Sequence, residues 1–188
     1  ISILNILVLL PLVLPPVVVG YVLLILFSDN GPMGHFLNHF FGVSFNFSWK
    51  GAVLAGAVVS FPLLVRAIKQ GFDSLDHKIE EVAIIHGANK FYCFFSITVP
   101  QMLPSIITGI TLAFARCLAE FGATITFVSN IPGETRTLSL ALYTVSSIPG
   151  TDYIALRLVI ISILLAFFAI SISEILNRRY LKKSRGID

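Results

Sequence analysis

Residues 158–176 read LVIISILLAFFAISISEIL, and this stretch of 19 residues decides the fold class because it carries a single charge, Glu174. An α-helix of that length is about 28 Å long, close to the thickness of the hydrocarbon core of a bilayer. Hydrophobic residues make up 56% of the 188 residues and charged residues 12%, about half the charged share of soluble domains. The mean hydropathy is +0.89. These values argue against a soluble enzyme, a disordered chain and a coiled coil, and indicate a membrane protein.

Three further apolar stretches accompany this one, so we predict a single all-α integral membrane domain, residues 1–188, built as a helical bundle of about four spans. The spans are predicted at about residues 6–27, 51–70, 103–128 and 158–176. The first contains three prolines, which a membrane helix tolerates where neighbours satisfy the freed backbone groups. Because the chain opens on Ile1 and runs straight into apolar sequence, we expect that a further N-terminal span is missing.

The distribution of basic residues predicts the orientation of the spans. Nine of the 13 lysines and arginines lie between residues 66 and 100 or in the tail after residue 176. The positive-inside rule therefore places the central segment, about 73–100, and the C-terminus in the cytoplasm. Segments 28–50 and 129–157 then form outer loops.

Two opposite charges lie within the predicted third span. Arg116 and Glu120 are four residues apart, so they share a helix face and can form an ion pair. A charge at the centre of a membrane costs at least about 2.5–3.5 kcal/mol, so the pair indicates a bundle interior, a water-filled cavity or a subunit interface. Thr124, one turn further along, is placed to add a hydroxyl contact. The sequence leaves open whether these residues lock two helices together or line a transport pathway.

The central cytoplasmic segment carries signals of two short helices joined by a turn, which we term the elbow. Asp76 and Asn89 are suited to cap the N-termini of the two helices. Gly87 suits the left-handed position just after a helix end. We expect Pro100 and Pro104 to keep the second helix separate from the third span. On these grounds alone, the elbow could equally be an interfacial anchor.

The elbow also resembles the coupling motif of ABC importer permeases. The matching residues are Glu81-Val82-Ala83, Gly87 six positions after Glu81, and Val99-Pro100 beginning twelve positions after Gly87. The family typically has Glu-Ala-Ala, then Gly, then Leu-Pro, so this chain departs from the motif at two positions while keeping apolar side chains there. The resemblance implies that the elbow docks onto a cytoplasmic ATPase subunit. It also implies that Glu81, Ala83, Gly87 and Pro100 are coupling residues rather than catalysts.

Two further stretches are similar to the permeases of bacterial molybdate importers: LPLVLPPVVVGY at residues 10–21 and RCLAEFGATITFVSNIPGETRT at residues 116–137. Sulfate permeases share the core of the second stretch but look less similar in its flanks. The resemblance covers essentially the whole chain and implies a multi-pass subunit of the bacterial inner membrane with a cytoplasmic C-terminus. The implied partners are a second permease copy in a homodimer, two ATPase subunits that use ATP and Mg, and an extracytoplasmic molybdate-binding protein.

Arg136, in the second outer loop, is a candidate pathway residue with three roles open: receiving the anion, pairing with Glu134, or holding a docked binding protein. The sequence has no glycine-rich phosphate loop and no nucleophile–base–acid set, so we predict no catalytic residue and no cofactor in this chain. We also predict no metal site, because the histidine pair His35 and His39 has no further ligand nearby. The basic tail is interpreted as a topology anchor rather than a nucleic-acid site. Alternative functions are a sulfate or tungstate ABC permease, a gradient-driven anion carrier and a non-transporting scaffold.

Overall fold

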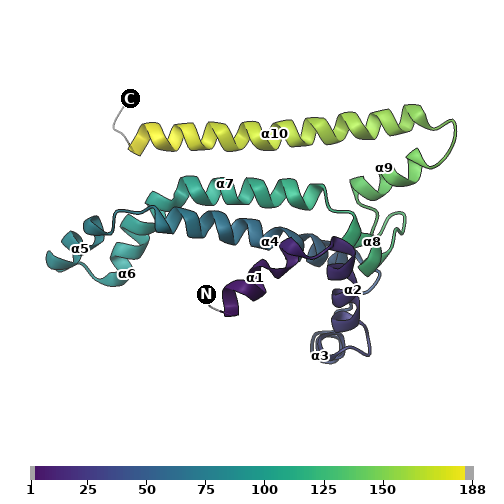
Figure 1. Cartoon of the computed structure of the whole chain (residues 1–188), viewed down its shortest axis with the longest axis horizontal. Coiled ribbons are helices and arrows are strands. Elements are labelled where there is room, and N and C mark those ends of the chain that lie inside the picture. The colour runs from purple at the N-terminus through teal and green to yellow at the C-terminus, as the bar shows by residue number, and fades with distance from the viewer. Residues whose placement is uncertain (1–2, 185–188) are drawn as a thin grey trace. The chain divides into compact units, whose positions relative to one another are not determined.

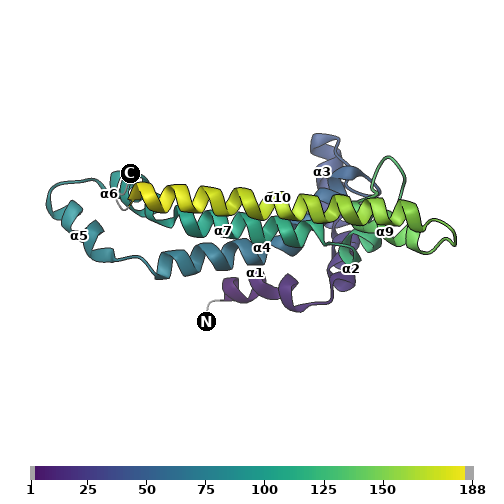
Figure 2. The same cartoon turned by 90° about the horizontal axis from the view of Figure 1, so that it is seen from above.

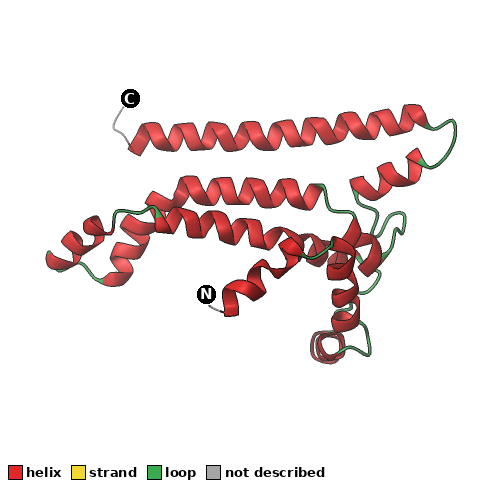
Figure 3. Ribbon diagram, viewed as in Figure 1, coloured by secondary structure: helices red, strands yellow, loops and turns green. Residues whose placement is uncertain are grey.

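The computed structural model describes residues 3–184, and every regular element within that range is a helix (Figure 3). The element η1 is a π-helix and the others are α-helices. In chain order (Figure 1) they are α1 (Ile3–Val13), α2 (Pro16–Phe27), α3 (Pro32–Phe41), α4 (Trp49–Asp73), α5 (His77–Ile85), α6 (Lys90–Cys93), η1 (Phe94–Thr98), α7 (Val99–Leu118), α8 (Gly122–Val128), α9 (Leu138–Ser146) and α10 (Asp152–Ser184). The all-helical fold class is thus confirmed for the described residues. The chain divides into two compact units, and α4, α7 and α10 each contribute to both.

The first unit comprises Ile1–Pro62 and Ala113–Phe167. Its buried apolar core combines residues of α2, α4 and α8: Val19, Leu23, Ala55, Val59, Ala123, Phe127 and Val128. Gly20 allows α2 and α8 to approach closely, because a Cβ at this position would lie 2.5 Å from the carbonyl oxygen of Ala123. Small residues at such contacts are typical of membrane helices, which associate through close packing.

The predicted first span, residues 6–27, is two helices rather than one. The axes of α1 and α2 differ by 116° across the break at Leu14 and Pro15 (Figure 2). Pro16 is the first residue of α2, and a residue that precedes a proline is driven out of the helical region. Two consecutive prolines therefore end α1 and start a new helix, so the predicted first span corresponds to a bent pair of helices.

Three helices are long and apolar enough to cross a membrane: Trp49–Asp73, Lys90–Leu118 and Asp152–Tyr180. The bent pair α1 and α2 would make a fourth if the two helices form one span. The predicted second and fourth stretches lie inside α4 and α10. The predicted third stretch, 103–128, differs at its far end, because α7 stops at Leu118 and a separate α8 begins at Gly122.

The second unit comprises Leu63–Leu112 and Phe168–Asp188, and contains the end of α4, the elbow helices, the start of α7 and the end of α10. Two glycines bring α4 and α7 together within it. A Cβ at Gly71 would overlap the side chain of Ser105, and one at Gly109 would lie 3.0 Å from the Cβ of Ala67. The end of α10 joins the same unit through Asn177, whose side-chain amide donates to the hydroxyl of Thr108 at 3.4 Å.

The expectation that Pro100 and Pro104 separate the elbow from the third span is wrong. The helix runs from Lys90 through η1 into α7 without a break. The π-helical turn widens the backbone just before Pro100, and the N–H of Val99 bonds to the carbonyl of Phe94, five residues back. Pro104 has no N–H to offer to the carbonyl of Pro100. The hydroxyl of Tyr180, from α10, donates to that carbonyl instead.

Candidate functional site

The elbow is held in shape by side-chain caps at both of its helices, as we predicted. The carboxylate of Asp76 accepts a hydrogen bond from the N–H of Lys78 at 3.1 Å and caps α5. The side-chain oxygen of Asn89 accepts from the N–H of Phe91 at 3.3 Å and caps α6. Each cap satisfies a backbone donor that the first turn of a helix leaves free.

Gly87 ends α5 in the left-handed conformation, with φ at +88°, as its position in the sequence indicates. The N–H of Ala88 bonds to the carbonyl of Ala83 at 3.0 Å, and the N–H of Gly87 bonds to the carbonyl of Ile84 at 2.9 Å. This pair of bonds is the Schellman motif, which satisfies the carbonyls at the end of a helix. Ala83 and Gly87 therefore shape the turn of the elbow through their backbones.

The outer face of α5 is apolar and is not covered by the described part of the chain. Ile79, Val82 and Ile85 recur every third residue and are 48%, 54% and 80% exposed. Glu81 is exposed beside them, and its side chain forms no hydrogen bond or ion pair with any other described residue. An apolar stripe with a free carboxylate at its edge is a surface suited to contact with another protein or with lipid headgroups.

Arg116 and Glu120 form the ion pair that their spacing predicts. A guanidinium nitrogen, Nη2, of Arg116 lies 3.3 Å from Oε2 of Glu120, which is buried with 2% of its side chain exposed. The other carboxylate oxygen, Oε1, accepts a hydrogen bond of 2.7 Å from the N–H of Ala123. Glu120 thus joins the end of α7 to the first turn of α8 across the break between the two helices.

Thr124 and Arg136 form no hydrogen bond or ion pair with Arg116 or Glu120. Thr124 is 1% exposed inside the core of the first unit. Arg136 lies exposed in the loop after α8, where its Nε donates to the side-chain oxygen of Asn130 at 2.9 Å. Asn130 in turn donates to the hydroxyl of Thr144 at 2.7 Å. The pairing of Arg136 with Glu134, which the sequence left open, is not among the contacts of the described residues.

Thr135 holds the loop that contains Arg136 closed through two hydrogen bonds, a structural role that the sequence did not predict. Thr135 is 2% exposed, accepts a hydrogen bond from the N–H of Ile131 at 2.9 Å and donates one to the carbonyl of Ser129 at 3.0 Å. Ser129 itself has φ at +65° and ψ at −165°, a conformation that side chains strongly disfavour. Thr137 caps α9 by accepting from the N–H of Leu140. Turn residues such as Gly133, with φ at +80°, are the only sequence signal of this compact loop.

The structure therefore places the candidate residues in two groups. Glu81, Ala83, Gly87 and Pro100 lie in the second unit, within the elbow or directly after it. Arg116, Glu120, Thr124 and Arg136 lie in the first unit. Within the described residues, no group of three or more His, Cys, Asp or Glu side chains could hold a metal ion.

Residues 2–182 match the family model described as "Binding-protein-dependent transport system inner membrane component". The chain is 57% identical over 169 residues to the "Molybdenum transport system permease protein ModB" of Escherichia coli strain K12, covering 90% of this chain and 74% of that protein. It is 51% identical over 174 residues to the protein of the same name from Haemophilus influenzae, covering 93% of this chain and 76% of that protein.

The match to a sulfate system is weaker. The chain is 33% identical over 181 residues to the "Probable sulfate transport system permease protein cysT" of Chlorokybus atmophyticus. That match covers 92% of this chain and 61% of the other protein. The order of these identities agrees with the resemblance noted in the sequence, where the flanks of residues 116–137 differ from those of sulfate permeases.

Proposed function

Because the chain belongs to the family of inner membrane components of binding-protein-dependent transport systems, we propose that it is the permease subunit of an ATP-driven molybdate importer. The observation that carries this proposal is the elbow in combination with the family match. A capped, rigid helical turn leads directly into a long apolar helix, Lys90–Leu118. Such an element can transmit a movement at its tip to the membrane as a rigid body.

The elbow is assigned to contact with a cytoplasmic ATPase subunit. Its exposed apolar stripe (Ile79, Val82 and Ile85) supports docking into a groove of another protein, since apolar helix faces bind in this way. Glu81 stands free at the edge of the stripe to pair with a basic group of that partner. ATP and Mg are used by the partner, and closure of two ATPase subunits tilts the elbows of two permease copies.

The pathway of the anion is assigned to the interface of two permease copies. Arg116 supplies positive charge near the break between α7 and α8, while Glu120 holds that charge in place. An anion pathway needs donors with modest positive charge, enough to attract the ion without trapping it. Arg136 lies exposed in the following loop, and we assign it to the side where an extracytoplasmic binding protein delivers the anion.

Molybdate is preferred as the substrate because the relatives named for molybdenum transport are 57% and 51% identical to this chain. Sulfate is the second candidate, supported by the relative named for sulfate transport at 33% identity. Both ions are tetrahedral dianions, so the same donors would serve either. Selectivity then rests mainly with the separate binding protein.

The test is uptake of radiolabelled molybdate into proteoliposomes that hold the full-length permease, its ATPase subunits and its binding protein. We expect uptake that requires ATP and persists in a large excess of sulfate. Effective competition by sulfate would move the substrate to sulfate while keeping the importer. Uptake that ignores ATP and follows an imposed ion gradient would contradict the importer and support a gradient-driven carrier.

A further inference from the structure

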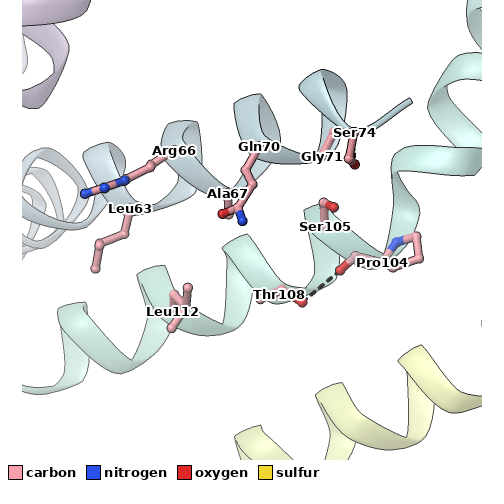
Figure 4. Close-up of a pocket in the computed structure, with 10 residues that line it drawn as sticks. All are labelled: Leu63, Arg66, Ala67, Gln70, Gly71, Ser74, Pro104, Ser105, Thr108 and Leu112. Carbon is pink, nitrogen blue, oxygen red and sulfur yellow. Dashed lines mark hydrogen bonds between the residues drawn. The ribbon is translucent and has the colours of Figure 1, made fainter. Parts of the chain in front are cut away.

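The pocket beside Arg66 lies between α4 and α7 within the second unit and has a volume of about 410 Å³ (Figure 4). The guanidinium of Arg66 extends along α4, away from the side chains of Gln70 and Ser105. The polar groups of this pocket therefore do not converge on one ligand. A surface that separates apolar from polar groups more clearly lies in the first unit, on the short helix α3.

The turn that precedes α3 fixes this helix against the end of α2. Pro32 is the first residue of α3, a position that suits proline because its ring presets a helical φ. A Cβ at Gly34 would lie 2.0 Å from the carbonyl oxygen of Ser28 and 2.4 Å from that of Phe27, so a side chain at this position would prevent the contact. With 10 residues, α3 is about 15 Å long and cannot cross a hydrocarbon core of about 30 Å.

Apolar and polar side chains occupy different faces of α3. Met33, Phe36 and Phe40 are spaced by three and four residues, so they share one face, and each is more than half exposed. We term these three residues the apolar strip. The rings of Phe36 and Phe40 lie 4.7 Å apart within it. His35 and Asn38 are exposed on another face. This separation is typical of a helix that lies at the boundary between an apolar phase and water.

The segment around α3 has the composition of a membrane–water boundary. Six of the 22 phenylalanine, tyrosine and tryptophan residues lie between residues 36 and 49, whereas no lysine, arginine, aspartate or glutamate lies between residues 30 and 49. Phe47 and Trp49 are exposed as well. Tryptophan is enriched at the level of the lipid headgroups, and phenylalanine is typical of the apolar face of interfacial helices. A partner that is recognised by its charge would find no ion-pair partner in this segment.

The position of α3 agrees with such a boundary. Trp49 begins α4, a helix long and apolar enough to cross a membrane, and Val53 is exposed one turn later. Seven residues, 42–48, connect α3 to α4, and the rings of Phe27 and Phe45, 5.4 Å apart, hold this connection against the end of α2. Figure 1 shows α3 end-on while α4 runs across the page, and Figure 2 shows α3 upright, so α3 runs crosswise to α4. If α4 crosses the membrane, α3 lies along its surface.

We propose that α3 is an interfacial anchor, whose apolar strip inserts among the lipids of the leaflet next to Trp49 while His35 and Asn38 face water. The lipid surface is the occupant because the strip is apolar, lies in a segment without charges and adjoins the exposed start of a membrane-crossing helix. The inference goes beyond the importer function and does not depend on it, since it requires only that α4 crosses the membrane. The anchor holds the corner between α2 and α3 at the membrane surface.

The test uses single nitroxide spin labels on the full-length permease with its ATPase subunits, reconstituted in lipid vesicles after every native cysteine is replaced by serine. Oxygen concentrates in the bilayer, whereas a water-soluble nickel chelate stays outside it. The ratio of the two collision rates therefore reports whether a label lies in lipid or in water. Labels at Phe36→Cys and Phe40→Cys should favour oxygen severalfold over labels at His35→Cys and Asn38→Cys, the matched controls on the polar face of the same helix. Glu134→Cys, in the exposed loop after α8, is the reference for water.

Addition of the extracytoplasmic binding protein completes the test and should leave the oxygen collisions at Phe36→Cys and Phe40→Cys unchanged. Equal ratios on both faces of α3, in lipid or in water, would overturn the anchor. Labels on the apolar strip that are shielded from both probes would show that protein covers it, as a second permease copy would. Shielding that appears only with the binding protein would make the strip a docking surface for that protein. Because two positions report on the strip, the result stands if one variant fails to assemble.

Discussion

At the scale of single residues, Glu120 joins two helices with its two carboxylate oxygens. One accepts from the N–H of Ala123 at 2.7 Å and the other lies 3.3 Å from Arg116. Glu120→Gln keeps an oxygen for the N–H but loses the charge, whereas Glu120→Ala loses both contacts. We therefore expect the midpoint of thermal unfolding of the purified assembly to fall in both variants and further in Glu120→Ala. Loss of the buried hydrogen bond from the N–H of Ala123 alone should cost about 1–3 kcal/mol.

The control for this pair is Glu134, an exposed glutamate in the following loop whose side chain forms no hydrogen bond or ion pair with any other described residue. Glu134→Gln and Glu134→Ala should both leave the midpoint unchanged. If Glu120→Ala unfolds at the same temperature as Glu134→Ala, the assigned role of Glu120 in joining α7 to α8 is wrong.

Gly87 permits a prediction about coupling rather than stability. With φ at +88°, any residue with a side chain is strained there, although nothing lies within 4 Å of an added Cβ. Gly87→Ala should therefore reshape the elbow at a cost of about 1–2 kcal/mol and reduce ATP-dependent uptake severalfold. Gly87→Pro should abolish uptake while leaving membrane insertion intact, because proline also removes the N–H that bonds to Ile84.

Gly42 provides the matched control for Gly87. It ends α3 with φ at +60° and likewise has nothing within 4 Å of an added Cβ. Gly42→Ala thus introduces the same kind of strain outside the elbow and should leave the ATP dependence and rate of uptake nearly unchanged. Uptake that is equally reduced by both alanine variants would indicate general strain, and normal uptake by Gly87→Pro would refute the coupling role.

At the scale of elements, sequence signals located the helix caps and the proline break between α1 and α2, but not the continuity or the end of the long helix Lys90–Leu118. Asp76 and Asn89 cap α5 and α6 as predicted, since a cap depends on neighbours within three residues. The break between α7 and α8, before Gly122, contains no proline, so the local sequence does not signal it. The unbroken run through Pro100 depends on a π-helical turn and on a hydroxyl from α10, 80 residues away. Breaks that are decided by such distant contacts cannot be inferred from local sequence.

The contact between Tyr180 and Pro100 gives a prediction at this scale. The carbonyl of Pro100 lacks a helical donor because Pro104 has no N–H, and the hydroxyl of Tyr180 takes its place. Tyr180→Phe should therefore destabilise the assembly by about 0.5–1.5 kcal/mol, measured as a lower midpoint of thermal unfolding. Pro104→Ala restores an N–H for this carbonyl, so the loss of the hydroxyl should matter less in that background.

The double variant decides whether the two residues act on the same carbonyl. We expect the effect of Tyr180→Phe to shrink by at least about half when Pro104→Ala is present, as for residues that share one partner. If Tyr180→Phe lowers the midpoint equally in both backgrounds, the hydroxyl does not substitute for the missing N–H. The elbow would then be tied to α10 by packing alone.

At the scale of the whole molecule, composition predicted the class of protein and local spacing predicted the ion pair of Arg116 with Glu120. The pocket beside Arg66 could not be predicted, because its walls come from helices that are some 40 residues apart and meet through two glycines.

The membrane orientation remains a prediction, drawn from nine of the 13 basic residues. It determines which face the elbow presents to the cytoplasm and is therefore the condition for the whole mechanism.

Single cysteines can test this orientation in a protein whose native Cys93 and Cys117 are replaced by serine. Asp29→Cys and Glu134→Cys place thiols at exposed positions of the two outer loops, and Lys78→Cys places one on α5 of the elbow. A membrane-impermeant maleimide should label the first two in intact cells and the third only after permeabilisation, whereas inverted vesicles should reverse the pattern. Labelling of Lys78→Cys in intact cells would place the elbow outside, where no ATPase could reach it, and the importer mechanism would fail with the orientation.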